Sequence, residues 1–451
     1  MATIDIDQPG LSLKDLRSMM TRRGVKNLLV KELAANDVSK SQPYLSGSLD
    51  VTNVLPAGDV YVDVTPSKNR ILKAPLPLAW LTPDGGASTA PEAKLILYPQ
   101  YPEVRLSGFL RGADHAPSKL MNKREAGRLL FFGITEQNTV VGWVAGAESR
   151  LAAEVGGLNR TEQVGVFRKI PLQNTKQSSR QILLKELRRI HCAGWIESKS
   201  LDSSGSISPY RAQNGVGYTL EAELGVPRNG IAEPDFMGWE VKAGQLGSFA
   251  WPSLSKAMTL MTPQPTGGWY VNEGPESFVR KYGYADTRGC ADRLNFGGCF
   301  RANERHQKTR LTLAVRGFDL GTSKVTDDEG AVVLIDDQDK VAAEWSFVTL
   351  LSLWNRKHAQ AVYVAAEKND GENVQYRYGG RVRLGEATSF HKLISAIASG
   401  RVYYDPAIKL VDASTPTARI GKARSQFRVR FGDLPAMYNN FTEVSVFDDL
   451  P

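Results

Sequence analysis

Long apolar runs are missing from this chain of 451 residues. A membrane-spanning helix needs about 20 consecutive apolar residues, and the first ten residues are acidic and polar, unlike a secretory signal. The composition therefore predicts a cytoplasmic protein with no membrane partner. Hydrophobic residues still make up 42% of the chain, which is ordinary for a folded protein.

Cysteine is also scarce, with only Cys192, Cys290 and Cys299. An odd number without the spacing of a metal site does not indicate a zinc centre, and no histidine pair lies near Cys290 and Cys299. We therefore expect three reduced thiols, as in a cytoplasmic protein.

Acidic residues are outnumbered by basic ones, 48 to 56, which gives a formal net charge of +8. The excess is shared equally between residues 1–170 and 171–451, so it does not belong to one tail. A moderate basic excess of this kind is consistent with a polyanionic partner.

The length of the chain favours two domains. Residues 40–170 alternate short apolar segments with turns rich in glycine, proline and asparagine, including a predicted hairpin turn at 136–138. Residues 171–185 are rich in Gln, Ser and Lys and predict a linker that enters a helix at 182–190. We therefore place an N-terminal α+β accessory domain at 1–175, without a catalytic constellation, and a second domain at 176–451.

Two further segments have helical spacing. Apolar residues between 11 and 20 recur at that spacing and resume after Gly24 at 28–33, which predicts helical structure over 11–36. A predicted strand over 332–335 is followed by Asp336, Asp337 and Asp339. After these aspartates, the apolar residues from Val341 to Leu351 again have helical spacing. The three aspartates are compatible with a second metal site, but we favour an acidic turn before a helix.

The most informative stretch is 233–243, which reads as a turn that runs into a strand. Side chains alternate along a strand, so Glu240 and Lys242 share one face while Trp239 and Val241 point to the core. Asp235 reaches the charged face from the turn. The sequence therefore predicts two carboxylates and one ammonium group on one small surface.

Such a surface suits phosphodiester hydrolysis. Mg²⁺ prefers oxygen ligands and keeps several waters, and a bound metal can activate one water and offset charge on phosphorus. A lysine can orient that water or stabilise the same charge. The alternative is a half-exposed strand with a surface ion pair, which these few residues fit equally well.

The order Pro234-Asp235, a short spacer, and Glu240-x-Lys242 resembles the PD-(D/E)XK nuclease superfamily. Further segments occur in the order seen in the MvaI/BcnI family of type II restriction endonucleases. They are Asn214–Val226 with Asn229, Thr259–Pro265, Gln426–Arg430, Asp433-Leu434 and Met437-Tyr438. The chain resembles this family over about residues 180–445.

The resemblance implies a restriction-endonuclease-like α/β fold with a mixed central sheet flanked by helices. It implies that Asp235, Glu240 and the backbone carbonyl of Val241 ligate Mg²⁺, and that Lys242 acts on the nucleophilic water. A helix glutamate of the Thr-Leu-Glu type lies beside the metal in this family, which makes Glu221 a supporting acid; an ordinary surface glutamate is the alternative. The resemblance also implies a monomer that cuts duplex DNA one strand at a time, with a restriction or phage-defence role by analogy.

Two basic segments are candidates for DNA contact. Arg301, Arg305, Lys308 and Arg310 lie in one net-positive segment suited to phosphate binding, or to a solvated loop. Residues 413–432 contain no acid and include Arg424, Arg428 and Arg430 around a predicted strand at 427–431, which resembles the base-reading region of the family. The alternative for this segment is a basic surface loop with no base contact. A family His-Gly before that strand is absent here, so no recognition sequence is carried over.

Two other functions remain open from the sequence. A repair or structure-specific nuclease would share the same core and act on a different DNA substrate. A DNA-binding protein with an inactive nuclease fold would belong to another class, but the intact Asp235, Glu240 and Lys242 set argues against it.

Overall fold

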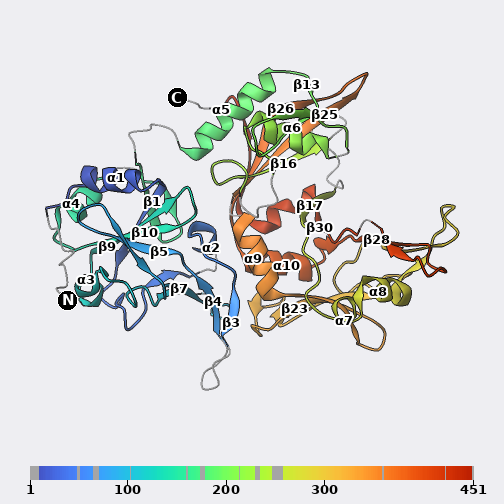
Figure 1. Cartoon of the computed structure of the whole chain (residues 1–451), viewed down its shortest axis with the longest axis horizontal. Coiled ribbons are helices and arrows are strands. Elements are labelled where there is room, and N and C mark those ends of the chain that lie inside the picture. The colour runs from blue at the N-terminus through green and yellow to red at the C-terminus, as the bar shows by residue number, and fades with distance from the viewer. Residues whose placement is uncertain are drawn as a thin grey trace. The chain divides into compact units, whose positions relative to one another are not determined.

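A computed structural model of the chain describes residues 10–47, 51–63, 71–101, 103–158, 161–172, 178–212, 214–228, 234–245, 257–357, 360–421 and 423–448. The chain divides into two compact units, Met1–Lys176 and Gln177–Pro451, and each is described by itself (Figure 1). Within these ranges, none of the helices has both the length and the apolar character needed to cross a membrane.

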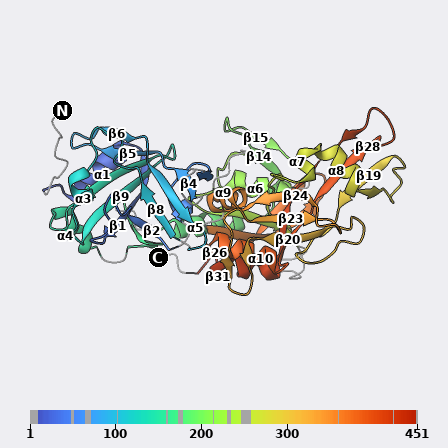
Figure 2. The same ribbon diagram turned by 90° about the horizontal axis from the view of Figure 1, so that it is seen from below.

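The N-terminal unit contains two sheets (Figure 2). The seven-stranded sheet has the order β11 (Gln163–Val164), β12 (Phe167–Ile170), β1 (Val25–Leu33), β9 (Arg128–Thr135), β10 (Val140–Ala145), β5 (Leu78–Leu81) and β6 (Ala87–Ala90). The five-stranded sheet has the order β2 (Tyr44–Ser46), β8 (Glu103–Ser107), β7 (Lys94–Tyr98), β4 (Ile71–Pro75) and β3 (Tyr61–Asp63). The helices are α1 (Leu13–Arg22), α2 (Val51–Val54), α3 (Ser118–Asn122) and α4 (Arg150–Gly156).

The helix predicted over 11–36 is correct only in its first half. Helix α1 begins after Ser12, whose hydroxyl caps it by accepting a hydrogen bond from the Asp15 N–H. The second half, 28–33, is wrong as a helix, because it belongs to strand β1, which pairs with β12 on one side and β9 on the other. A short apolar run buried on both faces of a sheet cannot be told from a buried helix by periodicity.

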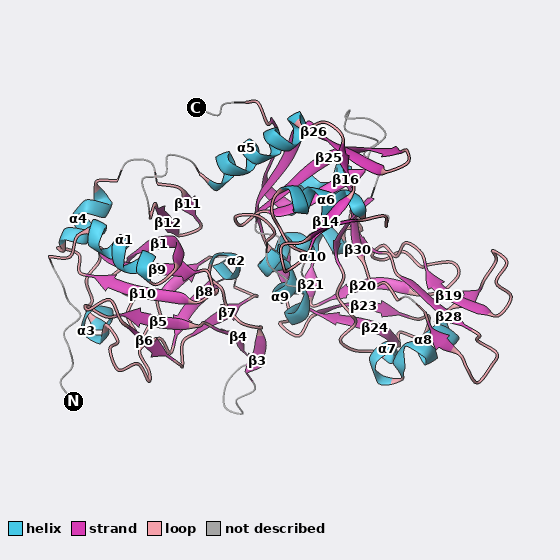
Figure 3. Ribbon diagram, turned by 45° about the horizontal axis from the view of Figure 1, so that its top comes forward, coloured by secondary structure: helices cyan, strands magenta, loops and turns pink. Residues whose placement is uncertain are grey.

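The C-terminal unit is organised around a mixed sheet in the order β13 (Ile196–Glu197), β26 (Val374–Thr388), β25 (Gln360–Asp370) and β16 (Glu240–Gln245), with β31 (Tyr438–Ser445) also paired to β26 (Figure 3). Strand β16 runs parallel to β25, and β26 runs antiparallel to it. Helices α5 (Ser179–Cys192) and α6 (Gly215–Glu223) pack apolar side chains on one face of this sheet. The predicted mixed α/β fold is therefore confirmed.

Smaller sheets and helices complete this unit. The sheets are β17 (Ala257–Met261), β30 (Phe427–Arg430) and β27 (Val402–Tyr404); β20 (Thr312–Arg316), β23 (Ala331–Ile335) and β24 (Val341–Ser346); and β18 (Tyr284–Ala285), β19 (Arg293–Gly297), β28 (Ala407–Val411) and β29 (Arg419–Ile420). Two hairpins are β14 (Lys199–Leu201) with β15 (Ile207–Pro209), and β21 (Phe318–Asp319) with β22 (Lys324–Val325). The remaining helices are α7 (Trp269–Asn272), α8 (Gly274–Tyr282), α9 (Phe347–Lys357), α10 (Phe390–Ala398) and the 3-10 helix η1 (Phe431–Met437).

The helix predicted from Val341 begins later than its sequence spacing indicates. Residues 341–346 form strand β24, and helix α9 starts at Phe347. Asp336 closes the hairpin between β23 and β24 by accepting hydrogen bonds from the N–H groups of Gln338 and Lys340, both at 3.0 Å. The acidic turn that we favoured over a metal site is therefore present, but it precedes a strand.

Candidate active site

The turn before β16 brings Asp235 back onto that strand. Phe236 and Trp239 exchange two backbone hydrogen bonds, at 2.9 and 2.8 Å, across Met237 and Gly238. Both central residues have positive φ, 49° and 87°, which is the pattern of a type I′ turn. Glycine adopts this conformation freely, whereas methionine at positive φ costs about 1 kcal/mol. Glu233, the first residue of the motif stretch, lies outside the described residues.

Asp235 binds the edge of β16. Its Oδ2 atom accepts a hydrogen bond of 2.9 Å from the backbone N–H of Val241. That N–H therefore points away from β25, the one strand paired to β16 in the described chain. The N–H and C=O of one strand residue lie on the same edge, so the Val241 carbonyl is on the edge that Asp235 occupies. Two of the three predicted metal-ligating oxygen groups thus lie together.

Glu240 and Lys242 form an ion pair on the sheet face opposite α5 and α6. The predicted alternation is confirmed, because Trp239 and Val241 lie in the core beneath those helices. However, the face is not open: the Glu240 side chain is 0% exposed and the Lys242 side chain 22% exposed. The alternative of a surface ion pair is therefore wrong.

Two tyrosines that no sequence motif singled out lie within electrostatic reach of Glu240. Tyr363, the β25 partner of Lys242, is buried, and its hydroxyl lies 2.7 Å from the hydroxyl of buried Tyr438. Burial raises the pKa of both tyrosines, and the negative charge of Glu240 adds to that rise. These residues are distant in sequence and no motif spacing connects them.

The charge state of Lys242 follows from its neighbours. Burial alone lowers the pKa of an amine, but the Glu240 carboxylate, followed by Asp235 and Glu221, more than offsets this and raises the pKa of Lys242. Lys242 is therefore an ammonium at neutral pH. The same interactions show that Glu221, on α6, lies within electrostatic reach of the pair, as the resemblance implied.

The donor set suits a hard cation. Asp235, Glu240 and the Val241 carbonyl offer oxygen atoms only, which is what Mg²⁺ prefers, with waters completing its shell. No group of three or more His, Cys, Asp or Glu side chains in the described ranges is arranged to hold a metal ion. Glu221 contributes negative charge near Lys242.

The basic candidates fall into separate groups. Arg301 stacks over the Tyr403 ring at 4.6 Å, and Arg428, opposite Tyr403 in the β27–β30 ladder, donates to Asp405 at 2.7 Å. Arg430, also on β30, is exposed, and within the described chain its side chain forms no ion pair. The tertiary structure thus joins Arg301 to the C-terminal arginines, which the sequence placed in different segments. Arg424 is exposed, and its backbone forms an isolated β-bridge with Ala407.

The remaining basic candidates are held by neighbours within the protein. Arg305 donates two hydrogen bonds to Asp337, at 2.7 and 2.8 Å, and Arg310 pairs with the same carboxylate at 2.9 Å. Lys308 lies 4.7 Å from the centre of the Tyr284 ring. Asp337 is therefore a partner of arginines and not a metal ligand.

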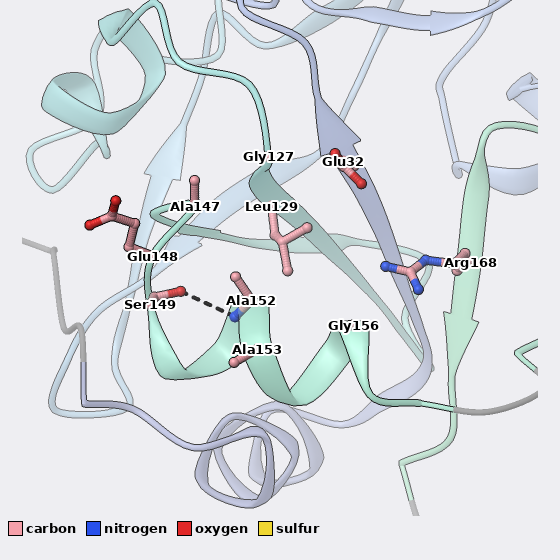
Figure 4. Close-up of a pocket in the computed structure, with 10 residues that line it drawn as sticks. All are labelled: Glu32, Gly127, Leu129, Ala147, Glu148, Ser149, Ala152, Ala153, Gly156 and Arg168. Carbon is pink, nitrogen blue, oxygen red and sulfur yellow. Dashed lines mark hydrogen bonds between the residues drawn. The ribbon is translucent and has the colours of Figure 1, made fainter.

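A pocket of about 290 Å³ lies in the N-terminal unit, between β1, β9, β12 and α4. Figure 4 shows Glu32 and Arg168 on one side of it and the residues around Ser149 on the other. It contains none of the candidate catalytic residues.

A mixed sheet with a buried acid–lysine pair and a second acid at its edge is typical of metal-dependent nucleases. The model of the MvaI/BcnI restriction endonuclease family matches residues 184–438, and the chain belongs to this family. It is accordingly a DNA endonuclease of the type II restriction endonuclease kind, a class that generally uses divalent metal ions.

Solved structures of distant relatives are also similar. The restriction endonuclease MvaI–cognate DNA substrate complex is 19% identical with a TM-score of 0.44. MvaI in the absence of DNA is 18% identical with a TM-score of 0.34. Each match covers 60% of this chain and 100% of the MvaI chain. No curated protein matches the sequence.

Proposed function

We propose that this protein is a Mg²⁺-dependent endonuclease that cleaves duplex DNA as a monomer, in restriction or phage defence. The observation that carries the proposal is the burial of Glu240 against Lys242, with Asp235 delivered to the same strand. A buried charge pair is costly to desolvate, and perturbed ionisable groups of this kind cluster at functional sites. Cleavage is assigned to residues 177–451, with the N-terminal unit as an accessory domain.

Each residue has a defined task in this proposal. Asp235, Glu240 and the Val241 carbonyl would hold the metal ion, which supplies an activated water and offsets negative charge on the phosphate. Lys242 would orient the attacking water and stabilise the negative charge that develops on the phosphate. Glu221 adds to the rise in the Lys242 pKa, after the larger contributions of Glu240 and Asp235.

The direct test is incubation of the purified protein with unmodified plasmid and phage DNA. With Mg²⁺ we expect discrete fragments, and with EDTA we expect none, because the metal supplies the nucleophile. Asp235→Ala should be inactive under both conditions, which excludes a contaminating nuclease. Cleavage that persists in EDTA would contradict the proposal. A metal-dependent smear would indicate a non-specific nuclease governed by the N-terminal domain. Cutting of branched or mismatched DNA alone would favour the repair nuclease.

The arginines should differ in their effect on DNA affinity. Arg430→Ala is expected to weaken binding and to reduce the slope of log K against log salt by about 1, because one phosphate contact is lost. Arg305→Ala is the matched control, and we expect a smaller effect because the Nε and Nη2 groups of Arg305 already donate to Asp337. Binding of a duplex to the Asp235→Ala background in EDTA, measured across salt concentrations, provides both slopes. Equal slopes for the two variants would show that Arg430 makes no phosphate contact.

A further inference from the structure

Met237 lies at the tip of the active-site turn, and the cleavage chemistry described above does not require it. We propose that Met237 packs its side chain against the DNA beside the scissile phosphate, on a deoxyribose or base edge of a neighbouring nucleotide. The inference rests on the proposed function, because Asp235 and Glu240 define where that phosphate lies. It adds a residue that positions the duplex by apolar contact rather than by charge.

The place of Met237 in the chain fits such a contact. It is two residues from Asp235 and three from Glu240, in the turn closed by Phe236 and Trp239. The length of two extended residues, about 7 Å, is the upper limit of the distance between the Cα atoms of Asp235 and Met237, because the chain turns between Phe236 and Trp239. This limit corresponds to about two base-pair steps of 3.4 Å along one strand. A side chain at the tip therefore reaches the nucleotides next to the cut rather than a distant part of the duplex.

The conformation of Met237 is unusual for its residue type. Nine non-glycine residues in the described chain have positive φ, and Met237 is the one with a large apolar side chain. Glycine, asparagine or aspartate would occupy this turn position without that strain. At the adjacent Gly238, a Cβ atom would meet nothing within 4 Å, so the turn is not confined by packing there. Local strain of this kind is retained at functional sites.

Its exposure points to an external contact. Met237 is 53% exposed. A single exposed apolar residue is ordinary on a protein surface, but this one combines exposure with an unfavourable backbone and a position beside the catalytic acids. Methionine is flexible and polarisable and adapts to irregular surfaces, and it is among the apolar residues that insert against base steps in the minor groove.

The distribution of methionines allows DNA contact at Met237 to be measured by oxidation. Seven of the eight lie in the described residues, and six of these are buried: Met19, Met20, Met121, Met258, Met261 and Met437. Hydrogen peroxide transfers one oxygen atom to an accessible thioether and leaves as water. Mass spectrometry of the peptide that contains Met237 would follow its oxidation in the full chain, in EDTA, with and without a saturating duplex. We expect the duplex to slow oxidation at least about fivefold. An unchanged rate with the duplex bound would overturn the inference.

Substitutions separate the side chain from the turn. Met237→Gly relaxes the backbone, so we expect an unchanged or higher melting temperature together with a fall in duplex affinity of about tenfold. Met237→Leu, which restores an apolar side chain, should recover most of that loss. Leu320→Gly, at another exposed apolar position, is the control and should bind normally. Full affinity in Met237→Gly would overturn the inference.

The two proposals fail in different ways. If the unmodified protein cleaves no DNA with Mg²⁺, the proposed function fails, while protection of Met237 by a bound duplex would still support the contact. If cleavage occurs and Met237 oxidises equally fast in the complex, only the contact is wrong.

Discussion

Glu240→Gln is expected to lower the rate of metal-dependent DNA cleavage by about three orders of magnitude or more, because a neutral amide replaces the buried carboxylate that would hold the metal. The side chain is fully buried, so water cannot substitute for the lost charge. The measurement is single-turnover cleavage of plasmid DNA across a Mg²⁺ titration. Glu443→Gln is a matched control, since this acid lies on β31 of the same sheet and pairs with Arg383 at 3.3 Å.

A second variant distinguishes lost chemistry from lost folding. Glu240→Gln leaves the partly buried ammonium of Lys242 without its nearest counter-charge, which is destabilising. Adding Lys242→Met removes that charge as well, so the double variant should recover thermal stability without recovering cleavage. Retention of more than about a tenth of the activity in Glu240→Gln, in a folded protein, would contradict its role as a metal ligand.

Arg128→Met is expected to destabilise the N-terminal unit by about 4 kcal/mol and to lower its melting temperature by about 10 °C. Arg128 is 0% exposed. Its guanidinium donates to the carbonyls of Glu125, Leu120, Ala34 and Asp37, at 2.6, 2.7, 3.0 and 3.1 Å. Methionine fills a similar volume but leaves these buried acceptors without their donor, and each such loss costs about 1 kcal/mol or more.

The control for Arg128 is the same substitution at an exposed arginine of the same unit. Arg150 pairs with Glu154 at 2.7 Å on the surface of α4. Exposed ion pairs contribute about 0–1 kcal/mol, so Arg150→Met should leave the transition almost unchanged. Calorimetry of the full chain resolves whether the affected transition is that of the N-terminal unit. A small effect of Arg128→Met would show that water replaces the guanidinium.

The motif around Asp235 could be predicted because its information is local. Alternation along a strand depends only on backbone geometry, so the opposite directions of Val241 and Lys242 follow from the sequence, and the structure confirms them. The turn that returns Asp235 was predicted as well. What could not be predicted was the burial of Glu240, because β25, the strand paired with β16, comes from more than a hundred residues further along the chain.

Two segments that were predicted as helices from their apolar spacing are strands in the structure. Residues 28–33 and 341–346 have spacings compatible with a helix, yet both segments form strands. Strand β1 pairs with β12 and β9, whereas β24 pairs with β23 on one side and has an isolated bridge to Gly267 on the other. Local spacing records which side chains are apolar, but the partners that complete the hydrogen bonds come from distant segments. The tertiary environment therefore decided these elements.

The sequence by itself determined the nuclease family, the acid–acid–lysine order and the alternation of β16, because each depends on residues close together in the chain. Only the tertiary structure decided that Glu240 is buried, and that Arg301 lies beside the β27–β30 ladder while Arg305 is held by Asp337. The physical reason is that burial and electrostatic pairing depend on which distant strands and helices meet. That selection is made by packing of the whole unit and not by any local pattern.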